Sequence, residues 1–268
     1  MSLEKLVVIS SSDKDDSSQS NSDFTVTLRE KYYTQNVNQI MVKEITLPNV
    51  FYNIRATGTL KNNVLVYNNN GVLTSVTIPE GQYVISDLGS PPTNDLLTTI
   101  ETKVNTLEGA GTLSLDFDAV SQKVIWTWVA GNPYGFATKS QGNLMADVFG
   151  IANGDETQLG DLVQTPSYTP ALNGLDMVYV QSKGLAESNG IDGDFGLIPL
   201  TEAVSLADAP FGSLAYRKND DSELSTITYD VPRNLNRINI TLRDVDGNKL
   251  DIGTNTMTVI FKMFLASG

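Results

Sequence analysis

The side chains that could do chemistry in this sequence are few in kind. Its 268 residues include no histidine and no cysteine, which removes the commonest general base and the commonest transition-metal ligand. A thiol nucleophile, a thiolate zinc site and a disulfide framework are excluded as well. Catalysis or metal binding would therefore have to rely on carboxylates, supplied by 31 Asp and Glu residues.

Three acidic clusters could bind a cation. Asp244, Asp246 and Asn248 have the spacing of a calcium loop, but the glycine comes too early and no Glu closes a twelve-residue loop. A hairpin turn is the favoured interpretation here. Asp192-Gly193-Asp194 is short and ambiguous, and Asp13, Asp15 and Asp16 are expected to be solvated carboxylates in a loop. We expect no metal and no cofactor.

Trp126 and Trp128 are the aromatic pair that could stack on a sugar, if both faced solvent. They alternate with polar or smaller residues in an apolar run, which is more typical of a β-strand in the core. Exposed tryptophans would favour a β-sandwich binding module, such as a receptor- or carbohydrate-binding head. A carboxylate-based hydrolase would need two acids in one cleft, and no such pair is visible.

The charge of the chain limits its partners. Its formal net charge is −13 and its pI is near 4.3, with only 18 dispersed Lys and Arg residues. Nucleic-acid binding depends on clustered cations that release counterions, so no nucleic-acid partner is expected. The apolar run at 6–9 is too short for a signal peptide or a membrane span, which indicates a cytosolic product.

Alternating apolar residues predict β-strands over most of the chain. The C-terminal part is the clearest, with Ile238, Ile240 and Leu242 on one face, preceded by Ile227, Tyr229 and Val231 and followed by alternation over 257–265. Strands are also predicted at 24–28, 37–47, 64–67, 72–78, 113–117, 124–129, 177–181 and 195–200. A late run of antiparallel strands indicates a sandwich or a barrel.

The linker between the last two strands allows a prediction of their register. A three-residue loop at 246–248 would pair Leu242 with Ile252 and Arg243 with Asp251, which places apolar opposite apolar and unlike charges together. Residues 10–22, almost all polar, are expected to form a flexible arm or a long loop.

Helical spacing occurs only in the middle of the chain. A helix is predicted at 94–107, capped by Thr93 or Asn94, and a shorter one at 143–149. Residues 71–155 thus form a strand-helix-strand-strand-helix block that interrupts the β pattern. The block is interpreted as an inserted or elaborated α/β segment, with 1–70 and 156–268 forming the surrounding β domain.

Several short motifs occur in an order that resembles the penton, or minor capsid, proteins of virophages, polintons and polinton-like viruses. They are Asp23 to Leu28, Ile45 to Ile54, Ile78 to Tyr83 with Asp87-Leu88 and a helix after it, Leu144 to Ile151, Tyr179 to Ser182, and Leu242 to Gly247. The resemblance covers nearly the whole chain, although 200–222 matches nothing in the family pattern.

The resemblance implies an all-β fold, a single jelly-roll β-sandwich with the α/β segment inserted, and no catalytic residues. It implies a homopentamer at the five-fold vertices of an icosahedral capsid, made in the host cytoplasm and surrounded by a double-jelly-roll major capsid protein. Contacts in a five-fold ring are heterologous. The apolar loops with Phe51, Tyr52, Pro210 and Phe211 are candidates for that interface, or else for core and loop anchors.

Overall fold

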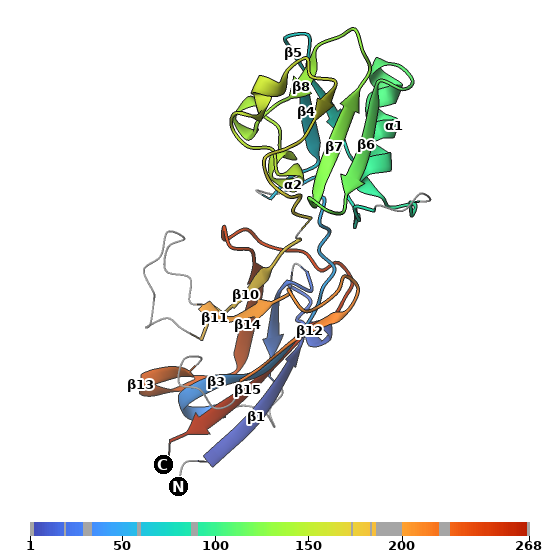
Figure 1. Ribbon diagram of the computed structural model, residues 1–268. Helices are drawn as coiled ribbons and strands as arrows, with labels where there is room; N and C mark the ends of the chain where they lie inside the picture. The colour runs from blue at the N-terminus through green and yellow to red at the C-terminus, as the bar shows by residue number, and fades with distance from the viewer. Residues whose placement is uncertain are drawn as a thin grey trace. The chain divides into compact units, whose positions relative to one another are not determined.

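The protein consists of two compact units, one formed by a single stretch of the sequence and the other by the two segments that flank it. The computed structural model describes residues 3–18, 20–28, 34–57, 60–86, 91–172, 174–182, 184–185, 200–219 and 226–266. One unit comprises Met1–Phe51 with Leu175–Gly268, and the other comprises Tyr52–Gly174 (Figure 1).

The first unit contains two antiparallel sheets. The larger has the order β1-β15-β3-β12, with β13 also pairing β3, and the smaller has the order β11-β10-β14-β2. The strands of the larger sheet are β1 (Leu3–Ser10), β3 (Thr34–Pro48), β12 (Leu214–Lys218), β13 (Thr226–Leu235) and β15 (Thr258–Leu265). Those of the smaller are β2 (Asp23–Thr27), β10 (Met177–Gln181), β11 (Leu200–Ser205) and β14 (Arg237–Arg243).

The pairing follows a nested pattern along the chain. The first strand of the unit pairs with the last, β2 pairs with β14, β3 pairs with β12 and β13, and β10 pairs with β11. A long antiparallel ribbon rolled into two sheets gives this order, which is the jelly roll. The predicted all-β jelly-roll class is confirmed.

The core of the first unit lies on the inward faces of its strands. Ile238, Ile240 and Leu242 are fully buried, as are Val259 and Phe261. Each such side chain contributes about 1.5–3 kcal/mol when removed from water. Alternation therefore predicted the inward face of β14 and β15 correctly.

One inward prediction in β13 is wrong, because the strand contains an irregularity. Thr228 lies opposite Gln39, but the next pair is Arg233 with Val37. Val231 falls between these pairs and is 73% exposed, while Tyr229 is buried and its hydroxyl donates to the Leu185 carbonyl at 2.7 Å.

The predicted register after β14 is also wrong. The backbones of Arg243 and Lys249 form an isolated antiparallel β-bridge, and the Leu250 N–H donates to the Leu242 carbonyl. Neither Ile252 nor Asp251 therefore lies opposite this end of β14. The buried Asp244 carboxylate holds the turn by accepting from the N–H groups of Asp246 and Asn248. The chain then crosses to the other sheet, where β15 pairs with β1 and β3.

Strands β11 and β12 lie within 200–222, the stretch that matches nothing in the family pattern. The strand predicted at 195–200 lies outside the described residues except for Leu200, where β11 begins. Between β1 and β2, the described residues 11–18 and 20–22 include a 3₁₀ helix at Ser11–Asp13, and the Asp15 N–H donates to the Thr25 carbonyl.

The second unit is an α/β fold with two small sheets of orders β5-β4-β8 and β6-β7-β9. Its strands are β4 (Val64–Asn69), β5 (Val72–Thr77), β6 (Leu113–Asp118), β7 (Lys123–Trp128), β8 (Tyr134–Phe136) and β9 (Val163–Gln164). Its α-helices are α1 (Leu96–Glu108) and α2 (Ala146–Phe149), with 3₁₀ helices at Lys139–Gln141 and Asp155–Gln158.

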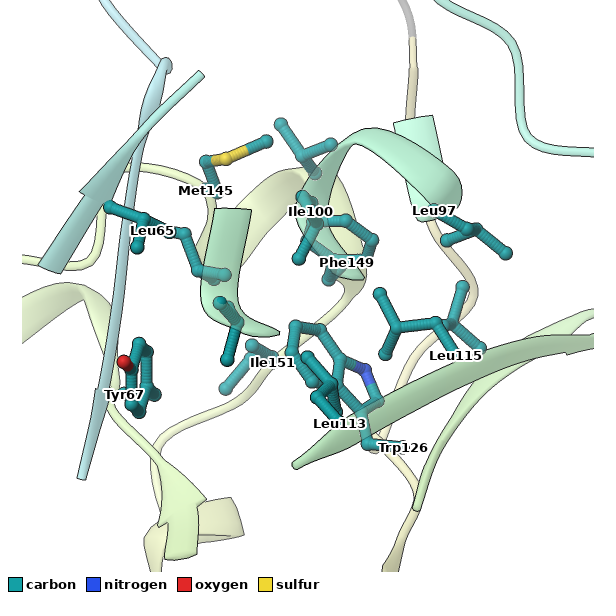
Figure 2. Close-up of a cluster of buried hydrophobic side chains, with 14 of the residues drawn as sticks. Leu65, Tyr67, Leu97, Ile100, Leu113, Leu115, Trp126, Met145, Phe149 and Ile151 are labelled. Carbon is teal, nitrogen blue, oxygen red and sulfur yellow. The ribbon is translucent and has the colours of Figure 1, made fainter. Parts of the chain in front are cut away.

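The core of this unit packs aromatic rings among aliphatic side chains, and Figure 2 shows Trp126 and Phe149 among leucine and isoleucine side chains. The Trp126 ring meets Phe149 edge-on at 5.3 Å between centroids, and Trp128 stacks on Tyr134 at 4.7 Å. The two tryptophans are 1% and 3% exposed. Their interpretation as core residues is confirmed, and they present no surface for a sugar.

The boundaries of the second unit differ from the expected 71–155. The unit runs from 52 to 174, because β4 pairs with both β5 and β8 and β9 pairs with β7. Helix α1 differs in its cap. Asp95, rather than Thr93 or Asn94, accepts from the Thr98 N–H at 2.8 Å.

Candidate assembly surfaces

The acidic clusters do not form a cation site in the described part of the chain. Asp15 accepts from the Thr27 N–H and hydroxyl and pairs with Arg237 at 3.0 Å. The Asp244 carboxylate accepts hydrogen bonds from the backbone of its own turn. Residues 192–194 lie outside the described residues. No group of three His, Cys, Asp or Glu that could hold a metal occurs among the residues described.

Exposed apolar side chains instead gather on the outward face of the larger sheet of the jelly roll. Leu6 and Val8 on β1 are each 61% exposed, and Val8 lies opposite the half-buried Ile260 of β15. On β12, Leu214 and Tyr216 are 63% and 57% exposed. We name Leu6, Val8, Ile260, Leu214 and Tyr216 the outer face.

Charged groups separate the apolar parts of the outer face. The row through Val8 and Ile260 continues across β3 to Glu44 and then to Lys218 on β12. Glu44 accepts a hydrogen bond from the Tyr216 hydroxyl, which raises the pKa of that tyrosine. Lys262, next along β15, pairs with Glu4 at 3.1 Å. The face thus combines apolar area with a few fixed charges, as protein interfaces do.

Strand β1 is an edge of its sheet within the described residues, since it pairs only with β15. Such an edge offers unpaired backbone N–H and carbonyl groups to another chain. The edge and the exposed side chains of Leu6 and Val8 therefore lie on the same strand.

The loop before β12 contains two of the predicted interface residues. Pro210 is exposed and Phe211 is 40% exposed. The loop is anchored by Asn49, whose side chain donates to the Ala209 carbonyl at 2.6 Å and whose backbone exchanges hydrogen bonds with Gly212 and Ser213. Pro210 and Phe211 thus lie in the turn that leads into β12, and Gly212 and Ser213 separate them from Leu214.

The other two predicted residues differ from each other. Phe51 is 8% exposed and belongs to the core of the jelly-roll unit, whereas Tyr52 is 39% exposed and is the first residue of the second unit. Sequence reasoning missed Leu6, Val8, Leu214 and Tyr216. The sequence carried no signal for Leu6 and Val8, because residues 6–9 are all apolar and only the structure separates these exposed side chains from the buried Val7 and Ile9.

Comparison with known proteins gives matches among solved structures but none among protein families or curated sequences. No protein-family model matches the sequence, and no curated protein sequence matches it. Among solved structures, the crystal structure of the selenomethionine-labelled mavirus penton protein matches with a TM-score of 0.50 and 13% sequence identity, covering 100% of both chains. The chain has the fold of this penton protein.

The similarity extends through both compact units, because it covers the entire length of each chain. The resemblance seen in the ordered sequence motifs is thereby confirmed at the level of fold. No helix in the described ranges is long and apolar enough to cross a membrane.

Proposed function

We propose that this protein is a structural capsid protein of the penton type. It assembles as a homopentamer at the five-fold vertices of an icosahedral virion, surrounded by a double-jelly-roll major capsid protein. The observation that carries the proposal is the full-length fold similarity to the mavirus penton protein. The protein acts without catalysis, in keeping with a sequence that has neither His nor Cys.

The outer face supports this proposal through its chemistry. A five-fold ring joins one surface of each subunit to a different surface of the next. The outer face supplies two such surfaces in one sheet, namely the β1 edge with Leu6 and Val8, and the β12 side with Leu214 and Tyr216. Pro210 and Phe211 adjoin the second of these.

The mass of the purified protein in solution tests the proposal. Light scattering and negative-stain imaging across concentration and salt should show rings near five times the 29.1 kDa chain mass. Trimers would indicate a receptor-binding head. A monomer under all conditions, including mixture with the major capsid protein, would contradict a penton role.

Substitutions on the outer face test which surface mediates assembly. Val8→Glu and Tyr216→Glu each place a charge in the proposed contact, and each should weaken assembly by about 2 kcal/mol per subunit contact. Val72→Glu is the matched control, because Val72 is 65% exposed but lies on β5 of the second unit. Equal weakening by all three would exclude the outer face as the interface.

The alternative of a carbohydrate-binding module that uses the two tryptophans has lost its support, since both rings are buried. A sugar site would have to be elsewhere in the chain.

A further inference from the structure

The second unit contains a hollow with an unusual concentration of positive charge. Its volume is about 370 Å³, and all its lining residues belong to the 52–174 unit. The cations that line it are Arg55, Lys61 and Lys139, together with one acid, Asp147.

This charge stands out against the composition of the unit. From 52 to 174 the sequence has five Lys and Arg residues against eleven Asp and Glu. Three of the five cations line the hollow, and only one of the eleven acids does. Asp147 pairs with Lys139, both being mostly exposed. The formal charges of the lining residues, three cations and one acid, sum to +2, in a unit whose formal net charge is −6.

The wall that carries Arg55 is held in place by a hydrogen-bond network. The Asn62 side chain accepts from the Arg55 N–H at 2.7 Å and donates to the Asn53 carbonyl at 2.8 Å. The buried Asn53 side chain in turn exchanges hydrogen bonds with the backbone of Tyr83. Arg55 Nε donates to the Tyr52 carbonyl at 3.2 Å. A cation on such a wall binds an anion at a lower ordering cost.

The uncharged part of the lining combines the amides of Asn53 and Asn62 with apolar and aromatic side chains, which restricts the ligand further. Leu60, Leu144 and Val148 contribute apolar surface, and the Tyr52 ring is 39% exposed. The hollow has the volume of about a dozen water molecules, which is more than a bare inorganic anion fills. A single sugar ring with a carboxylate fits both the size and the mixed chemistry, since carboxylates pair with guanidinium groups and tyrosine rings pack on apolar ring faces.

We propose that the hollow lined by Arg55, Lys61 and Tyr52 is a binding site for a carboxylate-bearing sugar at the end of a glycan. Arg55 and Lys61 pair with the carboxylate, and Tyr52 packs against the ring. The site gives the protein an acidic-glycan-binding activity that does not depend on its assembly into a capsid.

Ligand titration of the full-length protein, followed by saturation-transfer NMR and calorimetry, tests the proposal. The probes are sialyllactose, a glucuronate-containing disaccharide, neutral lactose, sodium sulfate and a short oligoglutamate peptide. At least one of the two acidic sugars should bind with a Kd of about 1 mM or tighter, and its affinity should fall as salt is added. Lactose should bind at least about tenfold more weakly, since it lacks the charge-assisted hydrogen bonds.

Two variants and a control locate the binding. Lys61→Gln and Arg55→Gln should each lower the affinity for the acidic sugar by about tenfold or more. Lys103→Gln, on the exposed side of α1 in the same unit, removes the same charge outside the hollow and should leave affinity unchanged. Lys61 is exposed, so its variant keeps the test valid if Arg55→Gln fails to fold.

Other outcomes would overturn the proposal. Equal binding of lactose, or equal weakening by Lys103→Gln, would show that the cations of the hollow do not select the ligand. Sulfate binding as tightly as the sugars would indicate an inorganic-anion site, and tighter binding of oligoglutamate would indicate an acidic protein partner. No binding of either acidic sugar would exclude the site.

Discussion

Gly150, which follows α2, shows how a single residue limits the packing of the second unit. Its φ is +70°, and a Cβ there would lie 2.3 Å from the Tyr168 carbonyl oxygen. Gly150→Ala combines an unfavourable backbone conformation with a clash against backbone, so we expect a loss of about 2–4 kcal/mol in the free energy of unfolding. Urea unfolding followed by tryptophan fluorescence measures this loss, because both tryptophans lie in this unit.

Gly142→Ala is the control for that substitution. Gly142 also has a positive φ, +89°, but nothing lies within 4 Å of the position its Cβ would take. It should lose only about 1 kcal/mol, the backbone part of the cost. Equal losses in the two variants would show that the backbone at Tyr168 moves aside for the new Cβ without reducing the free energy of unfolding.

The sequence predicted the burial of individual strand side chains well. Alternation identified Trp126, Ile240 and Phe261 as inward residues, and all three are buried. Helical spacing, by contrast, could not identify Leu107 as exposed. This side chain fits the apolar stripe of the predicted helix, but it lies in the last turn of α1 and is 56% exposed. Burial at an element's end depends on the tertiary neighbours, which local spacing does not specify.

At the level of elements, the start of α1 depends on the buried side chain of Asp95. Its carboxylate accepts from the Thr98 N–H and hydroxyl and from the Ser86 N–H at 3.1 Å. Asp95→Ala should therefore destabilise the second unit by about 1–2 kcal/mol, the usual cost of losing an N-cap. Tryptophan fluorescence in urea again gives the measurement.

Thr93→Ala tests the assignment of this cap. Thr93 is exposed and was one of the two caps expected from sequence, so its replacement should change stability by less than about 0.5 kcal/mol. A larger loss for Thr93→Ala than for Asp95→Ala would place the start of the helix earlier in the chain.

Strand positions were more predictable than strand partners. Periodicity located β2, β3, β10 and β14 to within a few residues, because a half-buried strand alternates on its own. The order of strands in a sheet depends on contacts far apart in sequence, and β14 and β15 were expected to form a hairpin although they belong to different sheets. The carboxylate of Asp244 fixes a turn that apolar matching alone did not reveal.

The outer face illustrates a further limit. Leu6 and Val8 were visible only as members of an apolar run, and they are exposed because they lie on the opposite face of β1 from the buried Val7 and Ile9. The hollow near Arg55 was not predictable either, since its lining residues are spread between 52 and 174. Only the fold brings them together.

At the scale of the whole molecule, the two units have separate cores and should respond separately to core substitutions. Ile240 and Ile100 are both fully buried, the first in the jelly-roll unit and the second in the 52–174 unit. Truncating either to Ala should cost about 2–5 kcal/mol in its own core. Tryptophan fluorescence reports the 52–174 unit alone, whereas far-ultraviolet circular dichroism reports the strands of both.

Ile100→Ala should therefore lower the urea midpoint seen by fluorescence. Ile240→Ala should leave that midpoint unchanged and lower only the midpoint of the jelly-roll phase in the circular dichroism curve. The reason is that each substitution leaves the packing of the other core intact, and separated sites add independently. If Ile240→Ala moved the fluorescence midpoint as far as Ile100→Ala does, the two units would unfold as one cooperative structure. Unfolding in two separate phases would instead show that the α/β unit is an autonomous insertion in the jelly roll.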